Sequence, residues 1–216
     1  MSASGHSRRG DRFGWVILVA SLGGISALTA VLKGLPSDFA VPVVVAQHRR
    51  PTPHTGDVLV EIFNRRTGLP VRMAEPGEPA SQPGVTVVPA GTIATLDADG
   101  AWSLTTQPSN SNVGNAILAS AAAQAPTIAV ILTGLLSDGA EGCRAVKRHG
   151  GRVLVQDPST AEAASMPAHA IATGCVDFVL PLERLAATVL ALTAAPGGAD
   201  LLSLSTPPWA HLDFGA

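Results

Sequence analysis

Three continuous apolar runs constrain the fold of this chain more than any other feature of its sequence. They cover Trp15–Ala20, Val41–Ala46 and Thr127–Leu132, and within them apolar residues follow one another instead of alternating with polar ones. Short runs of this kind, rich in β-branched residues, are typical of strands that are covered on both faces of a sheet. The runs therefore predict a buried sheet with helices on both sides.

Segments with helical spacing and many Ala and Leu residues lie between and after these runs. The segments are Ile25–Leu35, Asp57–Thr67, Val113–Gln124, Ala140–His149 and Leu182–Leu192. Strand and helix patterns that alternate along a chain favour right-handed crossovers between parallel strands. The expected fold class is α/β, with a doubly wound, mainly parallel sheet and helices on both faces. A chain of 216 residues is long enough to bury the core of one such domain.

The stretch from Leu69 to Leu104 differs in composition, because Pro, Gly and β-branched residues dominate it. Within and just beyond this stretch, Thr92–Leu96 and Ala101–Thr105 are predicted as two strands. They are joined through Asp97–Gly100, whose Asp-Gly ending is a turn signal. We therefore expect an added antiparallel hairpin.

Both ends of the chain lack a clear period. We expect a flexible basic tail over residues 1–13, one domain over 14–194 and an irregular tail over 195–216. Ser7-Arg8-Arg9 ahead of the first apolar run is similar to a twin-arginine export signal. Gly23-Gly24 interrupts the apolar stretch that such a signal would need. An export signal stays open as an alternative to the flexible tail. No run reaches the roughly 18 apolar residues that a membrane span needs.

Composition makes several classes of function improbable. Hydrophobic residues at 46% and charged residues at 14% are typical of a folded chain rather than a disordered one. A formal net charge of -2 gives no electrostatic attraction for nucleic acid. The two cysteines, Cys143 and Cys175, are too few for a disulfide framework and lack the spacing of metal ligands. We expect small buried thiols and a cytoplasmic protein.

One polar residue of a chemically useful type follows each apolar run: Ser21 after the first, His48 after the second and Asp138 after the third. Open α/β sheets place their working residues at the carboxyl ends of the strands, so these side chains can meet. A serine becomes a nucleophile when a histidine takes its proton and a carboxylate orients that histidine. Singly, Ser21 is also explained as a helix cap, His48 as a structural histidine, and Asp138 as a turn or cap residue.

Two better-known site types fit the sequence poorly. The α/β-hydrolases use the chain order Ser, acid, His, whereas the order here is Ser, His, Asp, and their G-x-S-x-G elbow would need a glycine at Val19. A dinucleotide-binding turn needs G-x-G-x-x-G and an acidic residue at the end of the second strand. Here the glycines are only Gly23-Gly24, and the second strand ends in Gln47-His48.

Several segments in order, at consistent separations between about Val16 and Leu192, together resemble the catalytic domain of the chemotaxis protein-glutamate methylesterases of the CheB type. The segments that carry the resemblance are Ala20–Leu28, Val45–His48, Ile131–Ala140, Val155–Pro158, Ser165–Pro167 and Val176–Leu182. The domain predicted over residues 14–194 would then be a catalytic domain of this type.

The resemblance implies a serine hydrolase that demethylates glutamyl γ-methyl esters on chemoreceptors and also deamidates certain receptor glutamines. By position, Ser21 would be the nucleophile, His48 the general base and then acid, and Asp138 the carboxylate that orients His48. The family's oxyanion hole corresponds to the backbone N–H groups of His48 and Leu135. The chemistry requires no metal or organic cofactor. The expected partner is a methylated chemoreceptor, with no nucleic acid and no membrane insertion.

The chain departs from the family's usual residues at three positions, with Leu22 in place of Thr, Leu136 in place of Gly and Asn115 in place of Asp. A catalytically degenerate member that binds a receptor or signalling partner is therefore the alternative function. A same-mechanism hydrolase of a different ester would have the same sequence features. Only 14 residues precede the first predicted strand, so no covalently attached receiver domain is expected.

The remaining basic residues near the site have simple expected roles. Arg49 and Arg50 follow the presumed base and are interpreted as solvated loop arginines, with contact to an acidic receptor surface as the alternative. The other histidines show no ligand cluster and are interpreted as structural or solvent-facing. They are His6, His54, His149, His169 and His211.

Overall fold

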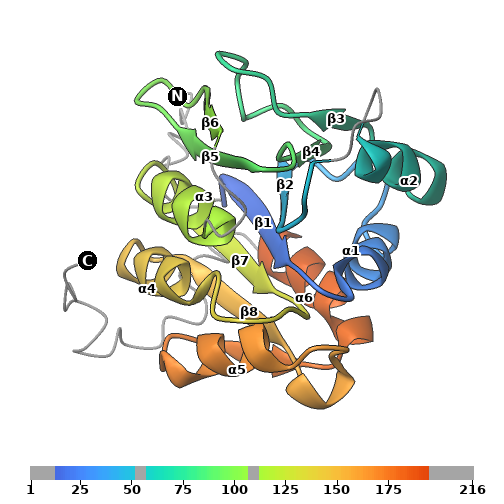
Figure 1. Cartoon of the computed structure of the whole chain (residues 1–216), viewed down its shortest axis with the longest axis vertical. Helices are drawn as coiled ribbons and strands as arrows, with labels where there is room; N and C mark the ends of the chain where they lie inside the picture. The colour runs from blue at the N-terminus through green and yellow to red at the C-terminus, as the bar shows by residue number, and fades with distance from the viewer. Residues whose placement is uncertain (1–12, 52–56, 107–111, 195–216) are drawn as a thin grey trace, which may run out of the picture.

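A seven-stranded parallel sheet forms the centre of the computed structural model, which describes residues 13–51, 57–106 and 112–194 (Figure 1). Its strands are β1 (Trp15–Ala20), β2 (Val43–Gln47), β3 (Val71–Met73), β4 (Val85–Val87), β7 (Thr127–Ile131), β8 (Arg152–Gln156) and β9 (Phe178–Leu180). The order across the sheet is β3-β4-β2-β1-β7-β8-β9. All neighbouring strands are parallel, which confirms the expected α/β class.

Helices cover both faces of this sheet (Figure 1). They are α1 (Gly24–Lys33), α2 (Val58–Arg66), α3 (Val113–Ala122), α4 (Ala140–Arg148), α5 (Ser165–Ala172) and α6 (Leu182–Ala194), with a 3-10 turn, η1, at Pro158–Thr160. The apolar cluster on one face joins α1, α2 and α6, and the cluster on the other joins α3, α4 and α5. Strand β1 contributes side chains to both clusters, since Val16 and Leu18 belong to the first and Ile17 and Val19 to the second. This two-sided burial explains why its sequence is apolar throughout.

The predicted helices all form, with ends that differ by up to two residues from those expected. The helix α5 was not predicted, because it is short and carries Pro167 in its first turn, where a missing N–H breaks no helical hydrogen bond. The strands β3, β4 and β8 were also missed. Three residues each are too few for β3 and β4 to show a period.

The predicted hairpin is confirmed as a separate two-stranded antiparallel sheet of β5 (Thr92–Leu96) and β6 (Trp102–Thr106). It packs beside α3, because Leu96 and Trp102 belong to the same apolar cluster as Ile117. The hairpin therefore extends the core on one face of the main sheet and does not join the parallel ladder.

The sheet order places the ends of three strands together. The central strand β1 pairs with β2 on one side and β7 on the other, with Ala20 opposite Gln47 and Val19 opposite Ile131. The chain continues from β1 to β2 on one side and later crosses to β7 on the other side of β1. In open α/β sheets, such a change of direction creates a crevice at the carboxyl ends of the strands. The residues that follow β1, β2 and β7 therefore meet at one edge of the sheet.

The ends of the chain are only partly covered by the described residues. Phe13, which the predicted N-terminal tail included, is buried in the core beside β1. Residues 1–12, with the possible export signal, and 195–216, with the predicted C-terminal tail, lie outside the described residues. Within the described ranges, no helix has both the length and the apolar character needed to cross a bilayer.

Candidate active site

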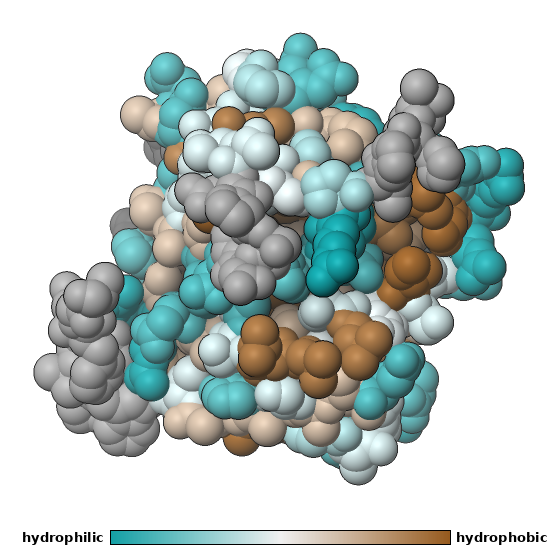
Figure 2. All heavy atoms as spheres, viewed as in Figure 1, coloured by the Kyte–Doolittle hydropathy of each residue, from teal (hydrophilic) through white to brown (hydrophobic). Residues whose placement is uncertain are grey.

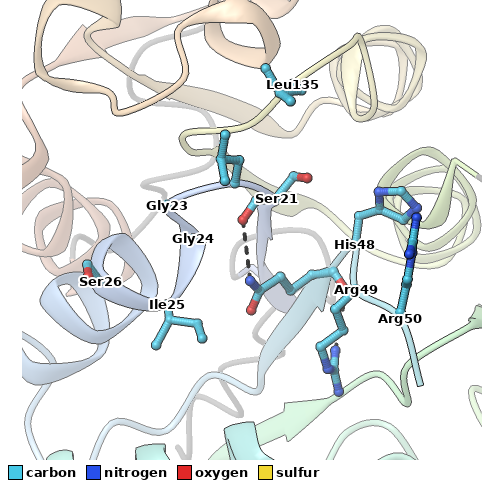
Figure 3. Close-up of a pocket in the computed structure, with 11 residues that line it drawn as sticks. Ser21, Gly23, Gly24, Ile25, Ser26, His48, Arg49, Arg50 and Leu135 are labelled. Carbon is cyan, nitrogen blue, oxygen red and sulfur yellow. Dashed lines mark hydrogen bonds between the residues drawn. The ribbon is translucent and has the colours of Figure 1, made fainter. Parts of the chain in front are cut away.

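Ser21 stands at the tight turn between β1 and α1. The Gly24 N–H donates to the Ser21 carbonyl at 2.9 Å, and Gly23 has φ 75° and ψ -1°, the geometry of the third residue of a type II turn. The same carbonyl accepts a hydrogen bond from Gln47 at 3.3 Å (Figure 3). The N-cap residue of α1 is Gly23, with no side-chain cap. The interpretation of Ser21 as a helix cap is therefore wrong.

The segment after β7 holds the Ser21 turn in place. The Ser21 N–H donates to the Thr133 carbonyl at 3.0 Å, and the buried Thr133 hydroxyl donates to the Leu22 carbonyl, also at 3.0 Å. That hydroxyl accepts from the Ala163 N–H at 2.8 Å. A Cβ at Gly134 would lie 2.9 Å from the Ser21 Cβ, so the close approach requires glycine.

His48 follows β2 and lies beside Ser21. A cavity of about 30 Å3 is lined by Ser21, His48 and Asp138 together with parts of the β7–α4 loop. In Figure 3 the Ser21 hydroxyl points toward the side of the pocket where the His48 ring lies. The structure thus brings together the three side chains that the strand ends predicted to meet.

The Asp138 carboxylate is bound to the first turn of α3. Its oxygens accept hydrogen bonds from the N–H groups of Gly114 at 2.9 Å and Asn115 at 3.1 Å. A Cβ at Gly114 would lie 2.4 Å from Val19 and 3.2 Å from both carboxylate oxygens, so glycine permits this contact. The following helix, α4, begins at Gly139 without a side-chain cap. Asp138 therefore caps α3 and does not cap α4, whereas the Ala140 N–H donates to the Ser137 carbonyl around it, which agrees with the interpretation of Asp138 as a turn residue.

Two opposing influences act on the Asp138 carboxyl. Burial raises its pKa above the ordinary value, while the N–H donors and the charge of His48 act in the lowering direction. The N–H donors at the start of a helix also favour a negative charge at this position. The net effect is a raised pKa for a carboxyl that is 9% exposed and adjacent to a histidine.

The two backbone N–H groups expected in the oxyanion hole differ in availability. The His48 N–H donates to the Ala20 carbonyl at 3.1 Å, which continues the ladder between β1 and β2. The Leu135 N–H takes part in no hydrogen bond among the residues that the structure describes. Of these two donors, the Leu135 N–H alone has no partner among the described residues.

A larger pocket of about 680 Å3 opens beside Ser21 and is lined by the β1–α1 turn, the end of β2 and Leu135 (Figure 3). Arg49 and Arg50 also line it. Arg49 pairs with Asp57, the N-cap of α2, and donates to the Val88 carbonyl at 3.1 Å. The interpretation as a solvated loop arginine is therefore wrong for Arg49, whereas Arg50 is exposed.

The three departures from the family's usual residues have different structural consequences. Leu22 is exposed in the turn that follows Ser21. Leu136 has φ 65°, the left-handed conformation that favours glycine. Asn115 accepts a hydrogen bond from the Gly142 N–H at 2.8 Å, and so satisfies a donor in the first turn of α4.

The other described histidines and both cysteines line neither cavity at Ser21. His149 and His169 are exposed, and each ring bonds to a carbonyl one helical turn earlier, as structural histidines do. His6, His54 and His211 lie outside the described residues. Cys143 and Cys175 are buried and unbridged as expected, and burial raises the pKa of the Cys143 thiol.

Sequence reasoning missed the residues that support the site. Thr133 and Gly114 act through hydrogen bonds and close packing, and Asn112 and Met166 line the small cavity with Ser21. Thr133 and Met166 lie in segments that carry the family resemblance, but their roles were not predicted from it. Gly114 gave a signal of its own, because a glycine at the start of a helix weakens the helix unless another group needs the space.

Comparisons with known proteins agree with this fold. The family model described as CheB methylesterase matches residues 16–189. The crystal structure of the Thermotoga maritima CheB methylesterase catalytic domain superimposes with a TM-score of 0.76 and 32% sequence identity, over 83% of this chain and 98% of that one.

Sequence relatives extend the comparison. A Leptospira interrogans protein is 33% identical over 178 residues, which cover 79% of this chain and 90% of the relative. An Anaeromyxobacter dehalogenans protein named protein-glutamate methylesterase/protein-glutamine glutaminase 2 is 36% identical over 190 residues. That match covers 86% of this chain but 55% of the relative, so the chain spans about half the length of the Anaeromyxobacter protein. On the combined family match, fold and sequence identity, the chain belongs to the CheB methylesterase family.

Proposed function

We propose that this protein hydrolyses glutamyl γ-methyl esters on a protein substrate, with Ser21 as nucleophile, His48 as general base and then acid, and Asp138 as the carboxylate that orients His48. The observation that supports this most directly is the cavity of about 30 Å3 that all three side chains line. Family membership supports the same reaction, since relatives carry the name protein-glutamate methylesterase/protein-glutamine glutaminase.

The reaction proceeds in two halves. His48 takes the proton of the Ser21 hydroxyl as its oxygen attacks the ester carbonyl carbon, and the tetrahedral intermediate collapses by breaking the bond to the methoxy oxygen. Methanol leaves with the proton from His48. Water then attacks the acyl-enzyme, again with His48 as base, and releases the glutamate carboxylate and free Ser21. A glutamine substrate follows the same course and releases ammonia.

The developing negative charge needs hydrogen-bond donors. The Leu135 N–H, which has no partner within residues 13–51, 57–106 and 112–194, is the donor that we assign to the oxyanion. The His48 N–H contributes only as a donor shared with the Ala20 carbonyl. Asp138, held by two N–H groups of α3, keeps the imidazole oriented and stabilises it when it becomes charged.

The expected substrate is a methylated chemoreceptor. The matching family is that of the CheB methylesterases, and the pocket of about 680 Å3 beside Ser21 is open enough to take a side chain presented by another protein. The chemistry requires no metal ion or organic cofactor from the protein.

Methanol release from a methylated receptor tests the proposal. Wild-type protein is expected to release methanol, and Ser21→Ala is expected to lower the rate by at least about a thousandfold because the nucleophile is lost. Ser103→Ala is the matched control, since Ser103 is exposed on β6 and lines neither cavity at Ser21. Equal rates for wild type and Ser21→Ala would overturn the proposal. Binding of the receptor without turnover by either would favour the degenerate binding module instead.

A further inference from the structure

Most of the large apolar side chains that are exposed in the described part of the chain lie around Ser21. Those that line its two cavities are Leu22, Ile25, Leu135 and Leu136, which we name the apolar rim. The others are Val58 and Val179. Figure 2 shows hydrophobic side chains in a row across the lower half of the visible face, over the carboxyl ends of the central strands. Clustered exposed apolar surface of this kind marks an interaction site, whereas scattered single residues do not.

The backbone of two rim residues is held by hydrogen bonds from neighbouring hydroxyl groups. The Thr133 hydroxyl donates to the Leu22 carbonyl at 3.0 Å, and the Ser165 hydroxyl donates to the Leu136 carbonyl at 2.9 Å. The left-handed backbone at Leu136 leaves that side chain 74% exposed. A non-glycine residue in this conformation is strained, and such strain persists where the surrounding structure enforces it, commonly at functional sites.

The rim is continuous with the proposed reaction centre. Leu22 directly follows the nucleophile, and Leu135 and Leu136 line the same small cavity as Ser21. Leu135 faces Ser21 across the pocket in Figure 3. A polypeptide whose glutamyl side chain reaches Ser21 must therefore lay its neighbouring residues against these leucines.

We propose that the apolar rim is a specificity determinant that selects polypeptides in which apolar side chains flank the esterified glutamate. This inference rests on the proposed hydrolase function and names the substrate feature that the same site would recognise. Apolar flanking residues would bury the exposed leucines, which is favourable, whereas charged or strongly polar ones would lose water against them without gaining a partner.

Two synthetic peptides test the selection. Each carries one glutamyl γ-methyl ester, with leucines at the flanking positions in the first and serines in the second. The kcat/KM of wild-type protein is measured for both, and the Kd of both is measured with Ser21→Ala, which leaves the rim intact. Because one half-exposed leucine covered on binding corresponds to about a tenfold effect, wild type is expected to prefer the leucine peptide by about tenfold or more.

The rim variant is Leu136→Asn, because asparagine tolerates the left-handed backbone and removes the apolar surface. It is expected to reduce the ratio of kcat/KM for the leucine peptide to that for the serine peptide severalfold, and any change in catalysis common to both peptides cancels in this ratio. The small ester p-nitrophenyl acetate, which has no flanking residues, measures that common change separately. Leu22→Thr is a second rim variant with the same expected direction for the peptides. Val179→Asn is the matched control, since Val179 is exposed on β9 away from the rim and should leave the preference as in wild type.

The outcomes separate the two proposals. The proposed selection by the rim would be overturned if the two peptides had equal kcat/KM with wild type and equal Kd with Ser21→Ala. A preference for the leucine peptide that is unchanged in Leu136→Asn would overturn it as well. If wild type hydrolyses neither peptide nor the small ester, the hydrolase proposal fails, and the Kd ratio in Ser21→Ala alone decides whether the rim selects apolar segments. A preference in Kd without turnover would support the rim as part of a binding module.

Discussion

Leu136 shows at the scale of one residue how the site imposes a conformation on its sequence. Its φ of 65° lies in the left-handed region, and no other non-glycine residue of the described ranges has a positive φ. A side chain in this region crowds its own carbonyl, which is why glycine is usual there. The family's usual glycine at this position, expected from the sequence resemblance, therefore has a clear backbone reason.

Leu136→Gly is predicted to raise the free energy of unfolding by about 0.5 to 1 kcal/mol, because strain relief exceeds the added freedom of the unfolded chain. Urea denaturation of wild type and variant measures the change. Leu135→Gly is the matched comparison, since Leu135 is also exposed but lacks the positive φ, and it should be destabilising. The same sign for both variants would contradict this account.

The raised pKa of Asp138 predicts how its contribution to stability changes with pH. Because the folded-state pKa lies above the ordinary value of 3.8, the folded state holds the proton over a window in which the unfolded state has lost it. The stability contribution of this carboxyl is therefore greatest below that window and falls as pH rises through it.

The free energies of unfolding of wild type and Asp138→Asn, measured at about pH 4 and about pH 7, test this sign. The difference, wild type minus variant, is predicted to be smaller at the higher pH. A difference that grows with pH would show that the backbone N–H donors outweigh burial at this carboxyl.

Single residues were predicted unevenly from the sequence. The positions of Ser21, His48 and Asp138 could be predicted because each follows a buried strand, and parallel strands share one carboxyl edge. The pairing of Arg49 with Asp57 could not, because it depends on the distance in space between the end of β2 and the start of α2, which the sequence does not give. The hydrogen bond from the His48 N–H to the Ala20 carbonyl could not be predicted either, because it depends on the register between β1 and β2, which composition does not encode.

At the scale of elements, α3 and α4 are joined through Asn115. Its side chain accepts from the Gly142 N–H in the first turn of α4, and its own N–H donates to Asp138. One residue therefore serves the start of both helices. Asparagine at the position where the family usually has aspartate keeps the acceptor without placing a second negative charge beside Asp138.

Asn115→Ala is predicted to lower the free energy of unfolding by about 1 kcal/mol, the usual cost of losing a helix cap. Asn115→Asp retains the acceptor and is predicted to preserve most of this stability. Thermal or urea unfolding of both variants against wild type makes the comparison, and equal losses in the two would argue against a capping role.

Elements differed in how readily the sequence revealed them. The long amphipathic helices and the continuous apolar strands were predicted because burial on one or two faces repeats along them. The short elements β3, β4 and α5 owe their structure to neighbours. Strand β4 pairs with β2, β3 pairs with β4, and α5 packs against β7 and β8.

At the scale of the whole molecule, a buried ion pair links helix α4 to the segment that precedes β9. Lys147 of α4 pairs with Asp177 ahead of β9, and both side chains are at least nine-tenths buried. Asp177 also accepts a hydrogen bond from the Val153 N–H of β8 at 2.8 Å. Helix α4, which follows the Asp138 turn, is thereby tied to the edge of the sheet.

Lys147→Ala is predicted to lower the free energy of unfolding by about 3 to 5 kcal/mol, because it leaves the Asp177 charge buried without its partner. Arg65→Ala provides the contrast, since Arg65 and Glu61 form an exposed pair whose loss should cost less than about 1 kcal/mol. Denaturant titration of both variants measures the two values. A loss for Lys147→Ala as small as that for Arg65→Ala would contradict the structural role of the buried pair.

The most direct test of the central claim is the rate of methanol release from methylated receptor by wild type, Ser21→Ala, His48→Ala and the double variant. If Ser21 and His48 act as one catalytic unit, each single variant should lose nearly as much activity as the double, at least about a thousandfold. Losses that multiply, with each single variant only mildly impaired, would contradict the claim that these strand ends assemble a nucleophile and its base.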